Sequence, residues 1–367
     1  MRQDEIVQIA GIEISASKER TNLMTKCVIV GFGRIGKEVL EQARKAGYKD
    51  VAWFTSTGVS GQFNYGSTQY EKGTPEQVAN GIKRVCSEHD VRIAFVAIPS
   101  SGDGAMELAI MQAFIAHDVR IVVAGKASLS QRFRDLEPHI DMIGSDAAVG
   151  GGTGVLPSIE QNILPLDPSP ITLKGVFNGT MNYILSGRWR RRPMDALLWE
   201  AQQLGYAEST FGTHNVALRL FCDELADVRK KTVIVINRTL RRRLGTILVP
   251  DDIQHVPLTE ESLESYVCEG ARCKYVVQVS TESMRFPGSE DAPGSLRLDT
   301  PELHVRAGFC HVPADSALDK WLPDGVGNAV EISQGGSHVL VSGEGAGPVT
   351  TARRMILNAH RLMQACR

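Results

Sequence analysis

Short apolar runs alternate with helical periodicity over the first third of the chain. Four runs consist almost entirely of apolar residues: residues 27–30, 51–54, 93–98 and 119–123. Runs of this kind are typical of strands buried on both faces of a parallel sheet. Three segments repeat apolar residues at helical spacing: residues 35–46, 75–88 and 105–117. The alternation predicts an α/β fold with a Rossmann-type, doubly wound parallel sheet.

The pattern changes after the glycine triplet Gly150–Gly152. Three segments have helical spacing: residues 179–187, 195–204 and 216–236. Five segments have the composition of strands: residues 171–177, 275–279, 302–312, 329–333 and 339–341. Together they predict an α+β domain with a mixed sheet, followed by a last helix at 350–365. Residues 1–25 carry no motif and are interpreted as an N-terminal extension.

Composition narrows the kind of protein. The chain has 367 residues, 43% hydrophobic and 22% charged, with a net charge of -2. This length favours two domains, and the charge favours neither a nucleic-acid nor a membrane partner. Seven cysteines without a CxxC pair indicate reduced thiols. Because no apolar stretch has the form of a signal peptide or a membrane span, we expect a cytoplasmic protein.

A glycine-rich turn follows the first predicted strand. Gly31-Phe32-Gly33-Arg34-Ile35-Gly36 has the spacing GxGxxG, after the apolar run and at the start of a predicted helix. In this context Gly31 permits a tight turn, Gly33 lets the backbone approach a pyrophosphate, and Gly36 lets the helix pack closely on the strand. We expect these six residues to bind a dinucleotide; a glycine turn without a ligand is the alternative.

The second predicted strand bears on the choice between NAD and NADP. An acid usually ends this strand and binds the adenosine ribose of NAD. Here the strand ends Phe54-Thr55-Ser56-Thr57, without an acid. Arg34, or the hydroxyls of Ser56 and Thr57, can face a 2′-phosphate instead. NADP is favoured, and NAD stays open.

Six blocks of sequence resemble motifs of one enzyme family, in the same order. They are Val122–Ala127 (V-V-T-A-N-K-A), Asp146–Gly152 (E-A-A-V-G-G-G), Lys174–Leu185 (G-I-x-N-G-T-x-N-Y-I-L), Glu200–Glu208 (E-A-Q-x-L-G-Y-A-E), Gly325–Val330 (G-x-x-N-A-V) and Gly343–Pro348 (G-x-G-A-G-P). The chain therefore resembles the homoserine dehydrogenases over about residues 27–360.

The resemblance implies an architecture and an activity. It implies a discontinuous dinucleotide-binding domain at 26–155 and 326–367, closed by the C-terminal helix. A substrate and dimerisation domain is implied at 156–325, in a short form without a C-terminal regulatory domain. The implied protein is a homodimer that interconverts L-homoserine and L-aspartate 4-semialdehyde with NAD or NADP, in the biosynthesis of threonine, methionine and isoleucine.

An aspartate and a lysine carry the expected chemistry. The family places them four residues apart on a helix, and Asp227 and Lys231 reproduce this spacing on one helix face. Hydride transfer needs a proton donor or acceptor at the alcohol oxygen, a role that an amine can take. The resemblance implies Lys231 for this role, oriented by Asp227, with Lys230 as the rival lysine. Lys126 is expected beside the nicotinamide or substrate and shares the role. A surface ion pair is the alternative for Asp227 and Lys231.

Further residues are implied as ligands. Glu208 is expected to bind the substrate ammonium through charge-assisted hydrogen bonds. Asp223 is expected to replace a missing substrate acid, and Thr180 to contact the substrate. Asn178 and Gly345 are expected at the cofactor, although Asn178 can instead cap a helix.

A turn after residue 145 resembles the family's sodium site. The matching positions are Asp146, Val149, Gly151 and Thr153. A hard cation suits such oxygen ligands. A glycine turn without a metal is the alternative.

Three departures from the family lie in or near the expected active cleft. Residues 209–215 replace a D-P-x-x-D loop, Gly125 replaces Asn, and Thr153-Gly154 replaces I-P. Three hypotheses therefore stay open: a homoserine dehydrogenase, a related oxidoreductase acting on another small hydroxy or carbonyl compound, and a non-catalytic nucleotide-binding protein of this fold.

Overall fold

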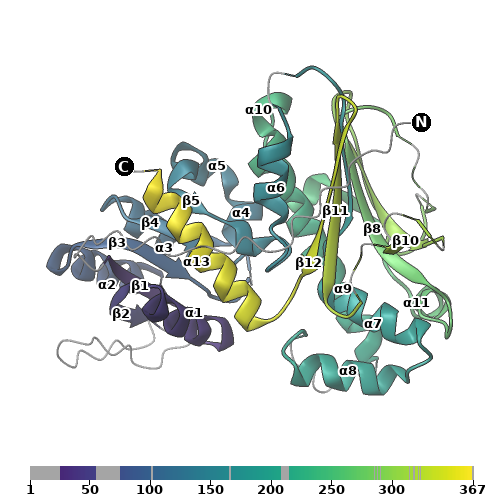
Figure 1. Ribbon diagram of the computed structural model, residues 1–367, viewed down its shortest axis with the longest axis horizontal. Coiled ribbons are helices and arrows are strands. Elements are labelled where there is room, and N and C mark those ends of the chain that lie inside the picture. Colours follow the sequence, from purple (N-terminus) through teal and green to yellow (C-terminus); the bar gives the residue numbers. More distant parts are fainter. Residues whose placement is uncertain are drawn as a thin grey trace. The chain divides into compact units, whose positions relative to one another are not determined.

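The chain forms two compact units. The computed structural model describes residues 25–54, 75–100, 102–164, 167–207, 215–284, 286, 288–289, 291–313, 315–316, 319–320, 322 and 324–365. Within them, residues 25–148 with 348–365 form one unit, and residues 149–347 form the other. We call them the five-stranded unit and the seven-stranded unit after their sheets; Figure 1 labels their elements.

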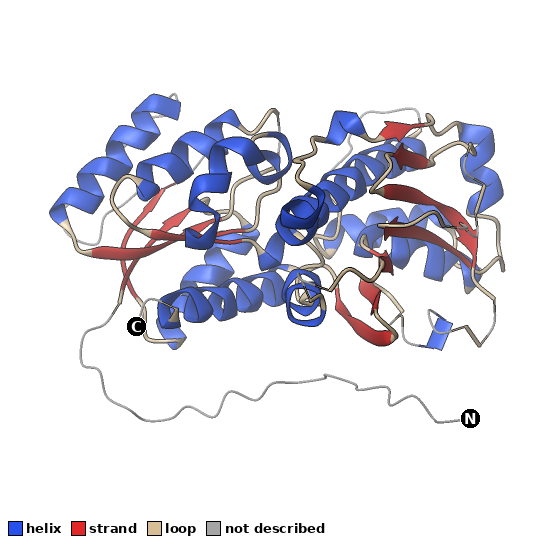
Figure 2. Cartoon of the chain, turned by 90° about the horizontal axis from the view of Figure 1, so that it is seen from above, coloured by secondary structure: helices blue, strands red, loops and turns tan. Residues whose placement is uncertain are grey.

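A parallel sheet forms the centre of the five-stranded unit, in the order β2-β1-β3-β4-β5. Its strands are β1 (Lys26–Val30), β2 (Lys49–Phe54), β3 (Val91–Val96), β4 (Arg120–Val123) and β5 (Ile143–Gly144). Its longer helices are α1 (Arg34–Lys45), α2 (Pro75–Glu88), α3 (Ala105–Ile115) and α13 (Pro348–Gln364). Helix α1 packs on α13 and α2 packs on α3, and helices lie on both faces of the sheet (Figure 2). The predicted doubly wound sheet is confirmed.

Helix α13 closes the five-stranded unit. Its Ala352 and Met355 share one buried apolar cluster with Ile29 of β1, Phe95 of β3 and Val122 of β4. Burying a large apolar side chain contributes about 1.5–3 kcal/mol. A helix from the far end of the chain is therefore part of this core, as the resemblance implied.

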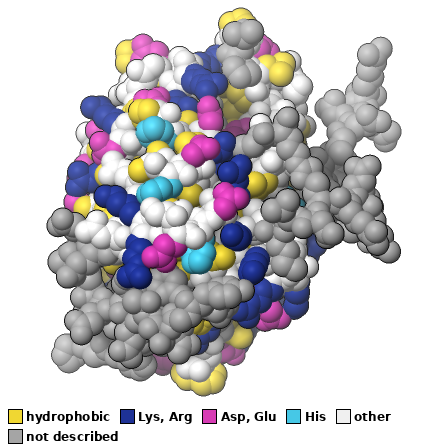
Figure 3. Space-filling model, turned by 90° about the vertical axis from the view of Figure 1, so that its left-hand side faces the viewer, with side chains coloured by type: hydrophobic (Ala, Val, Ile, Leu, Met, Phe, Trp, Pro, Cys, Tyr) yellow, Lys and Arg dark blue, Asp and Glu magenta, His cyan; other side chains and the backbone are white. Residues whose placement is uncertain are grey.

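The described surface mixes charges of both signs. Basic and acidic side chains are interspersed on the face drawn in Figure 3. Some pair along a helix, as Lys45 does with Glu41 and Arg84 with Glu88. Such exposed pairs are typical of a solvated face and contribute little stability. In the part of the chain that the structure describes, the cysteines are free, and no helix is long and apolar enough to cross a membrane.

An antiparallel sheet forms the seven-stranded unit, in the order β12-β11-β6-β8-β10-β9-β7. Its strands are β6 (Ile171–Val176), β7 (Gln254–His255), β8 (Cys273–Ser280), β9 (Leu296–Asp299), β10 (His304–His311), β11 (Gly327–Gln334) and β12 (Ser337–Glu344). The main helices are α6 (Val155–Asn162), α7 (Gly179–Trp189), α8 (Met194–Gln203), α9 (Val216–Val235) and α11 (Glu260–Tyr266). Helix α7 packs on β8 and β11, and α9 packs on α7.

Two features of this sheet differ from the expectation. The sheet was expected to be mixed, but every pairing within the described residues is antiparallel. Strand β11 pairs with β6 along its length, so β11 and β12 lie in the seven-stranded unit. The unit boundary therefore falls after Gly347, whereas the expected domain boundary was at residue 326. Strand pairing between distant segments decides both features.

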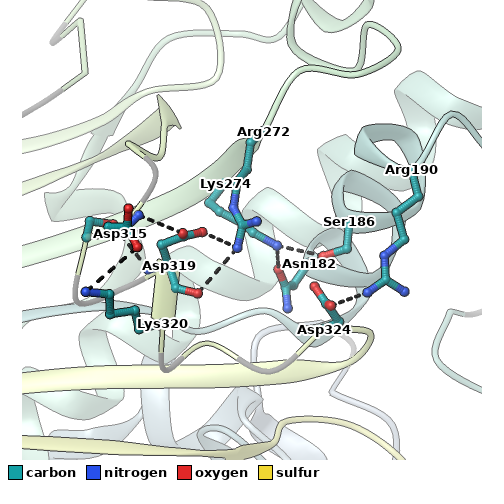
Figure 4. A network of polar contacts seen from close by, with 10 residues as sticks. Asn182, Ser186, Arg190, Arg272, Lys274, Asp315, Asp319, Lys320 and Asp324 are labelled. Carbon is teal, nitrogen blue, oxygen red and sulfur yellow. Dashed lines mark hydrogen bonds and ion pairs between the residues drawn. The ribbon is translucent and has the colours of Figure 1, made fainter.

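A buried lysine ties helix α7 to this sheet (Figure 4). Lys274 of β8 is 3% exposed, and its Nζ donates hydrogen bonds to Ser186 Oγ at 2.6 Å and to Asn182 Oδ1. The Asn182 amide in turn donates to the carbonyl oxygens of Gly325 and Gly327. Burial lowers the pKa of Lys274 to about 8, although the nearby Asp324 carboxylate opposes the shift. One amine thus fixes a strand, a helix and the start of β11.

The lowered pKa predicts a specific pH dependence of stability. The unfolded lysine keeps its proton to about pH 10.5 and the folded one to about pH 8, so within this window the unfolded chain binds more protons. Stability from this group therefore rises with pH across the window. We expect the free energy of unfolding of the wild type, minus that of Lys274→Met, to increase from pH 8 to 10.5 in urea titrations. Lys320→Met, at an exposed lysine, is the matched control. A difference for Lys274→Met that stays flat would contradict the prediction.

Candidate active site

The glycine turn after β1 has the geometry that its sequence predicts. Gly31 has a φ of +93°, and a Cβ there would lie 2.2 Å from the carbonyl oxygen of Ala97. Its N–H donates to the Phe54 carbonyl at 2.8 Å. A Cβ on Gly36 would lie 1.8 Å from the Gly31 carbonyl oxygen, whereas a Cβ on Gly33 would meet no atom within 4 Å. Two glycines therefore close the turn, and the third leaves an open approach to the start of α1, where free N–H groups suit a phosphate.

Aromatic stacking supports the turn from β2. Phe32 stacks on Trp53, with ring centroids 4.4 Å apart and planes at 18°. Arg34 is the first residue of α1, two residues after Phe32, and its side chain is exposed. Strand β2 ends at Phe54 without an acid, and Ser56 and Thr57 lie outside the described residues. The geometry is consistent with either dinucleotide and leaves Arg34 available to a 2′-phosphate.

Lys126 lies at the same edge of the parallel sheet as the glycine turn. It follows β4 as Gly31 follows β1, and the carboxyl ends of parallel strands meet at one edge. Its N–H donates to Ser100 Oγ at 2.9 Å. Ligands of open α/β sheets bind at this edge, so Lys126 follows a strand at the ligand-binding edge.

A second group of polar residues lies in the seven-stranded unit, where β6 ends and α7 begins. Asn178 caps α7, because its Oδ1 accepts a hydrogen bond from the Met181 N–H at 2.8 Å. Its Nδ2 donates to Glu224 Oε2 at 2.5 Å and to Asp227 Oδ2 at 3.1 Å. The structure thus shows the capping role expected as the alternative for Asn178, and the same side chain also reaches the acids of α9.

Lys231 completes this cluster. It is 7% exposed, and its Nζ lies 2.6 Å from Asp227 Oδ2 and donates to the Phe177 carbonyl at 2.9 Å. The i, i+4 pair on α9 thus exists, and it is not the surface pair of the alternative hypothesis. Lys230, one residue earlier, is only half-buried, which distinguishes the two lysines by environment.

Glu224 is a member of the cluster that the sequence analysis did not select. Asp223 was expected to replace the missing substrate acid, but it is exposed. Glu224 is half-buried and bonded to Asn178. Successive residues on a helix are about 100° apart, so only one of the two can face Asn178. The spacing of Glu224, Asp227 and Lys231 at i, i+3 and i+7 was the signal that could have identified it.

Thr180 lies in the part of the chain that the structure describes, whereas Glu208 does not. Thr180 is buried, and its hydroxyl donates to the Tyr206 carbonyl at 2.7 Å. The donor of Thr180 is therefore used to hold the turn after α8. That turn leads to Glu208, which lies outside the described residues.

The expected sodium ligands do not form one uniform set. Asp146 is buried in the five-stranded unit, where its carboxylate pairs with Arg361 and its N–H donates to Asn358 Oδ1. Because a guanidinium already balances this carboxylate, Asp146 does not fit as a sodium ligand. Val149, Gly151 and Thr153 belong to the seven-stranded unit, where the Thr153 hydroxyl donates to the Glu344 carbonyl at 3.2 Å. The described residues hold no cluster of three or more His, Cys, Asp or Glu side chains suited to a metal.

Gly345 makes a close backbone contact near these residues. A Cβ on it would lie 2.3 Å from the Asn328 side chain, and its N–H donates to the Val326 carbonyl at 2.7 Å. This position therefore requires glycine whether or not a cofactor lies nearby.

Comparison with known proteins identifies related sequences. The family model for homoserine dehydrogenase matches residues 171–358. The homoserine dehydrogenase of Sulfurisphaera tokodaii is 24% identical over 352 residues, which cover 93% of this chain and 99% of that enzyme. The enzyme of Synechocystis is 33% identical over 141 residues, which cover 37% of this chain and 31% of that enzyme. The match thus spans about a third of the Synechocystis enzyme and nearly all of the Sulfurisphaera tokodaii enzyme.

Solved structures share the fold. The homoserine dehydrogenase of Thermoplasma acidophilum superposes with a TM-score of 0.66 at 18% identity, over 93% of this chain and all of that one. A hyperthermophilic archaeal homoserine dehydrogenase in complex with NADPH gives 0.62 at 16% identity, over 94% and 98% of the two chains.

The crowding at the glycine turn predicts different effects for two similar substitutions. Gly36→Ala forces a Cβ against a backbone oxygen, so we expect it to lower the free energy of unfolding by about 1–3 kcal/mol. Gly33→Ala has room, so it should leave thermal stability near the wild type and weaken NADPH binding, because its methyl group occupies the approach to the phosphates. Thermal unfolding and NADPH fluorescence titration test the pair. Equal loss of stability in both variants would contradict this account.

Proposed function

The chain belongs to the homoserine dehydrogenase family, and we propose that it interconverts L-homoserine and L-aspartate 4-semialdehyde with NADP or NAD. The observation that carries this proposal is the cluster of Asn178, Glu224, Asp227 and Lys231. It lies within the segment that matches the family model, and it supplies a buried amine paired with the Asp227 carboxylate and a second carboxylate, Glu224, bonded to the same asparagine. A proton donor and a site for an ammonium are what this reaction needs from the protein.

The glycine turn is the proposed cofactor site. Its open approach at Gly33 and the crowding at Gly31 and Gly36 fit a dinucleotide pyrophosphate. When bound, NAD(P)⁺ supplies the hydride acceptor of the oxidation. We assign Lys126, at the same sheet edge, to the nicotinamide end of this site. The absence of an acid at the end of β2 and the exposed Arg34 favour NADP.

Lys231 is the proposed proton-transfer group. In the oxidation, the C–H electron pair of the alcohol carbon leaves as hydride, and the O–H proton passes to the Lys231 amine. In the reduction, the Lys231 ammonium returns that proton to the aldehyde oxygen. Asp227 and the Phe177 carbonyl hold the amine in one orientation, which lowers the entropic cost of reaching the reactive geometry.

The carboxylates are the proposed site for the substrate ammonium. Glu208 retains its expected role, and Glu224 takes the role first expected of Asp223, because Glu224 faces the cluster. Thr180 acts on this site indirectly, by holding the turn that leads to Glu208.

The proposal extends to the assembly, location, pathway and domain organisation of the enzyme. We propose a homodimeric, cytoplasmic enzyme of the biosynthesis of threonine, methionine and isoleucine. We propose that the discontinuous dinucleotide-binding domain corresponds to the five-stranded unit and that the substrate domain corresponds to the seven-stranded unit. For a sodium ion we propose the carbonyl oxygens of Val149 and Gly151 with Thr153 Oγ1 as ligands, since Asp146 pairs with Arg361.

The activity itself is tested with the purified full chain. L-homoserine with NADP⁺ or NAD⁺ should produce the reduced dinucleotide, followed by its absorbance. Dinucleotide binding without oxidation of homoserine would overturn the proposal and favour a relative that acts on another hydroxy compound, or one without catalysis.

A matched pair of neighbouring lysines tests the mechanism. We expect Lys231→Met to lower kcat by about 10²–10⁴-fold, because proton transfer loses its donor, while NADPH affinity stays unchanged. Lys230→Met is the control and should retain activity. Similar kcat values for the two variants would remove Lys231 from the mechanism.

Two neighbouring acids test substrate recognition. Glu224→Gln removes a charge that we assign to the substrate ammonium, so we expect KM for homoserine to rise about tenfold or more, as for loss of a charged hydrogen bond. Asp223→Asn, on the exposed side of α9, should leave KM unchanged. Steady-state kinetics distinguish the two, and the opposite ranking would restore Asp223 to the site.

A further inference from the structure

Gly125, the residue before Lys126, has no space for a side chain. A Cβ placed on it would lie 1.6 Å from Oε1 and 2.8 Å from Cδ of Glu107. Glu107 is in the first turn of α3, so the contact joins two segments of the five-stranded unit that are 18 residues apart. The family-like strand end of this chain therefore carries glycine at a position that a buried carboxylate already fills.

The Glu107 carboxylate cannot easily move aside. An exposed glutamate would rotate away from a new methyl group at little cost, but Glu107 is 2% exposed. Its Oε2 accepts hydrogen bonds from the Ser128 N–H at 2.7 Å and from the Ser128 hydroxyl at 2.6 Å. Ser128 is itself fully buried. Moving the carboxylate would leave two buried donors without their acceptor, which costs about 1–3 kcal/mol for each group.

The same segment is crowded by the start of α3. Gly104 has a φ of +79°, and a Cβ on it would lie 2.6 Å from both Ala127 C and Ser128 N. The Lys126 N–H is held by Ser100 Oγ, and the Lys126 carbonyl accepts from Ser130 Oγ at 2.7 Å. The backbone on both sides of Lys126 is therefore fixed by hydrogen bonds and close packing.

We infer that Glu107 is a positioning residue for Lys126: its carboxylate holds the backbone of residues 125–128 through Ser128 and requires glycine at position 125. The inference rests on the proposed function for the role of Lys126. It assigns no contact with substrate or cofactor to Glu107, which acts only through the segment that carries the lysine. It also explains why Gly125 departs from the family motif, since the buried Glu107 occupies the space of a side chain there.

A first double-mutant cycle tests the structural part. Gly125→Ala should destabilise the wild type by forcing the carboxylate off Ser128, but should cost little in a Glu107→Ala background, where the space is free. Urea unfolding of the wild type, both single variants and the double variant measures this coupling. Equal destabilisation by Gly125→Ala in both backgrounds would overturn the inference. If Glu107→Ala does not fold, Glu107→Asp, which withdraws the carboxylate by one methylene group, replaces it.

A second cycle tests positioning of the lysine. Glu107→Ala should lower kcat by about 10–100-fold through displacement of Lys126, whereas in a Lys126→Ala background it should change kcat by less than about threefold. Glu107→Gln keeps an oxygen acceptor for Ser128 and should restore most of the loss. A loss that is equally large without Lys126 would show general damage and overturn the positioning role.

The two proposals fail in different ways. A wild type that binds NADPH but does not oxidise homoserine would refute the proposed function. The first cycle would still test whether Glu107 fills the space at Gly125, because it measures stability alone. In the second cycle, NADPH affinity would be measured in place of kcat. An active wild type with additive effects in both cycles would refute the inference alone.

Discussion

The arrangement of helix α9 and strand β6 in the seven-stranded unit depends on the contacts of the buried Lys231 side chain. A charge removed from water has to be matched by partners, and breaking such a match typically costs about 3–5 kcal/mol. Here the partners come from two elements: Asp227 from α9, and the Phe177 carbonyl from the end of β6. The requirement therefore aligns α9 with the strand end, and Asn178, which caps α7, joins the same carboxylate. Stability and the proposed chemistry depend on the same contacts.

Space, rather than charge, is the governing constraint in the five-stranded unit. The turn between β1 and α1 closes because Gly31 and Gly36 allow backbone atoms to approach more closely than a Cβ permits. The segment around Lys126 follows the same principle, with Glu107 filling the place of a side chain at Gly125. Close packing of this kind leaves little freedom for the strand ends that face a ligand, and a preorganised site reduces the entropic cost of binding.

The charged residues of the chain divide by environment. Pairs such as Lys45 with Glu41 lie in solvent and contribute little. The pair of Asp146 with Arg361 instead joins the end of the sheet to α13, with Asp146 buried. This pair explains why an acid in a family-like glycine turn is not available as a metal ligand: α13 brings its own cation to it. The same residue type thus has a different role once the helix that closes the unit is in place.

The sequence by itself determined the features that depend on neighbouring residues. Four parallel strands, the GxGxxG turn and the shared helix face of Asp227 and Lys231 all follow from local features, namely continuous apolar runs, the spacing of three glycines and the 3.6-residue period of a helix. Only the tertiary structure decided the rest. The selection of Glu224 over Asp223 belongs here only in part, because helix spacing places Glu224 with Asp227 and Lys231, whereas its bond to Asn178 spans 46 residues. Three further features join segments that are distant in sequence: the bond of the Thr180 hydroxyl to the Tyr206 carbonyl, the pairing of β11 with β6 and the filling of the space at Gly125 by Glu107. Such contacts leave no periodic pattern along the chain, since they arise from burial and hydrogen-bond satisfaction after the elements have packed.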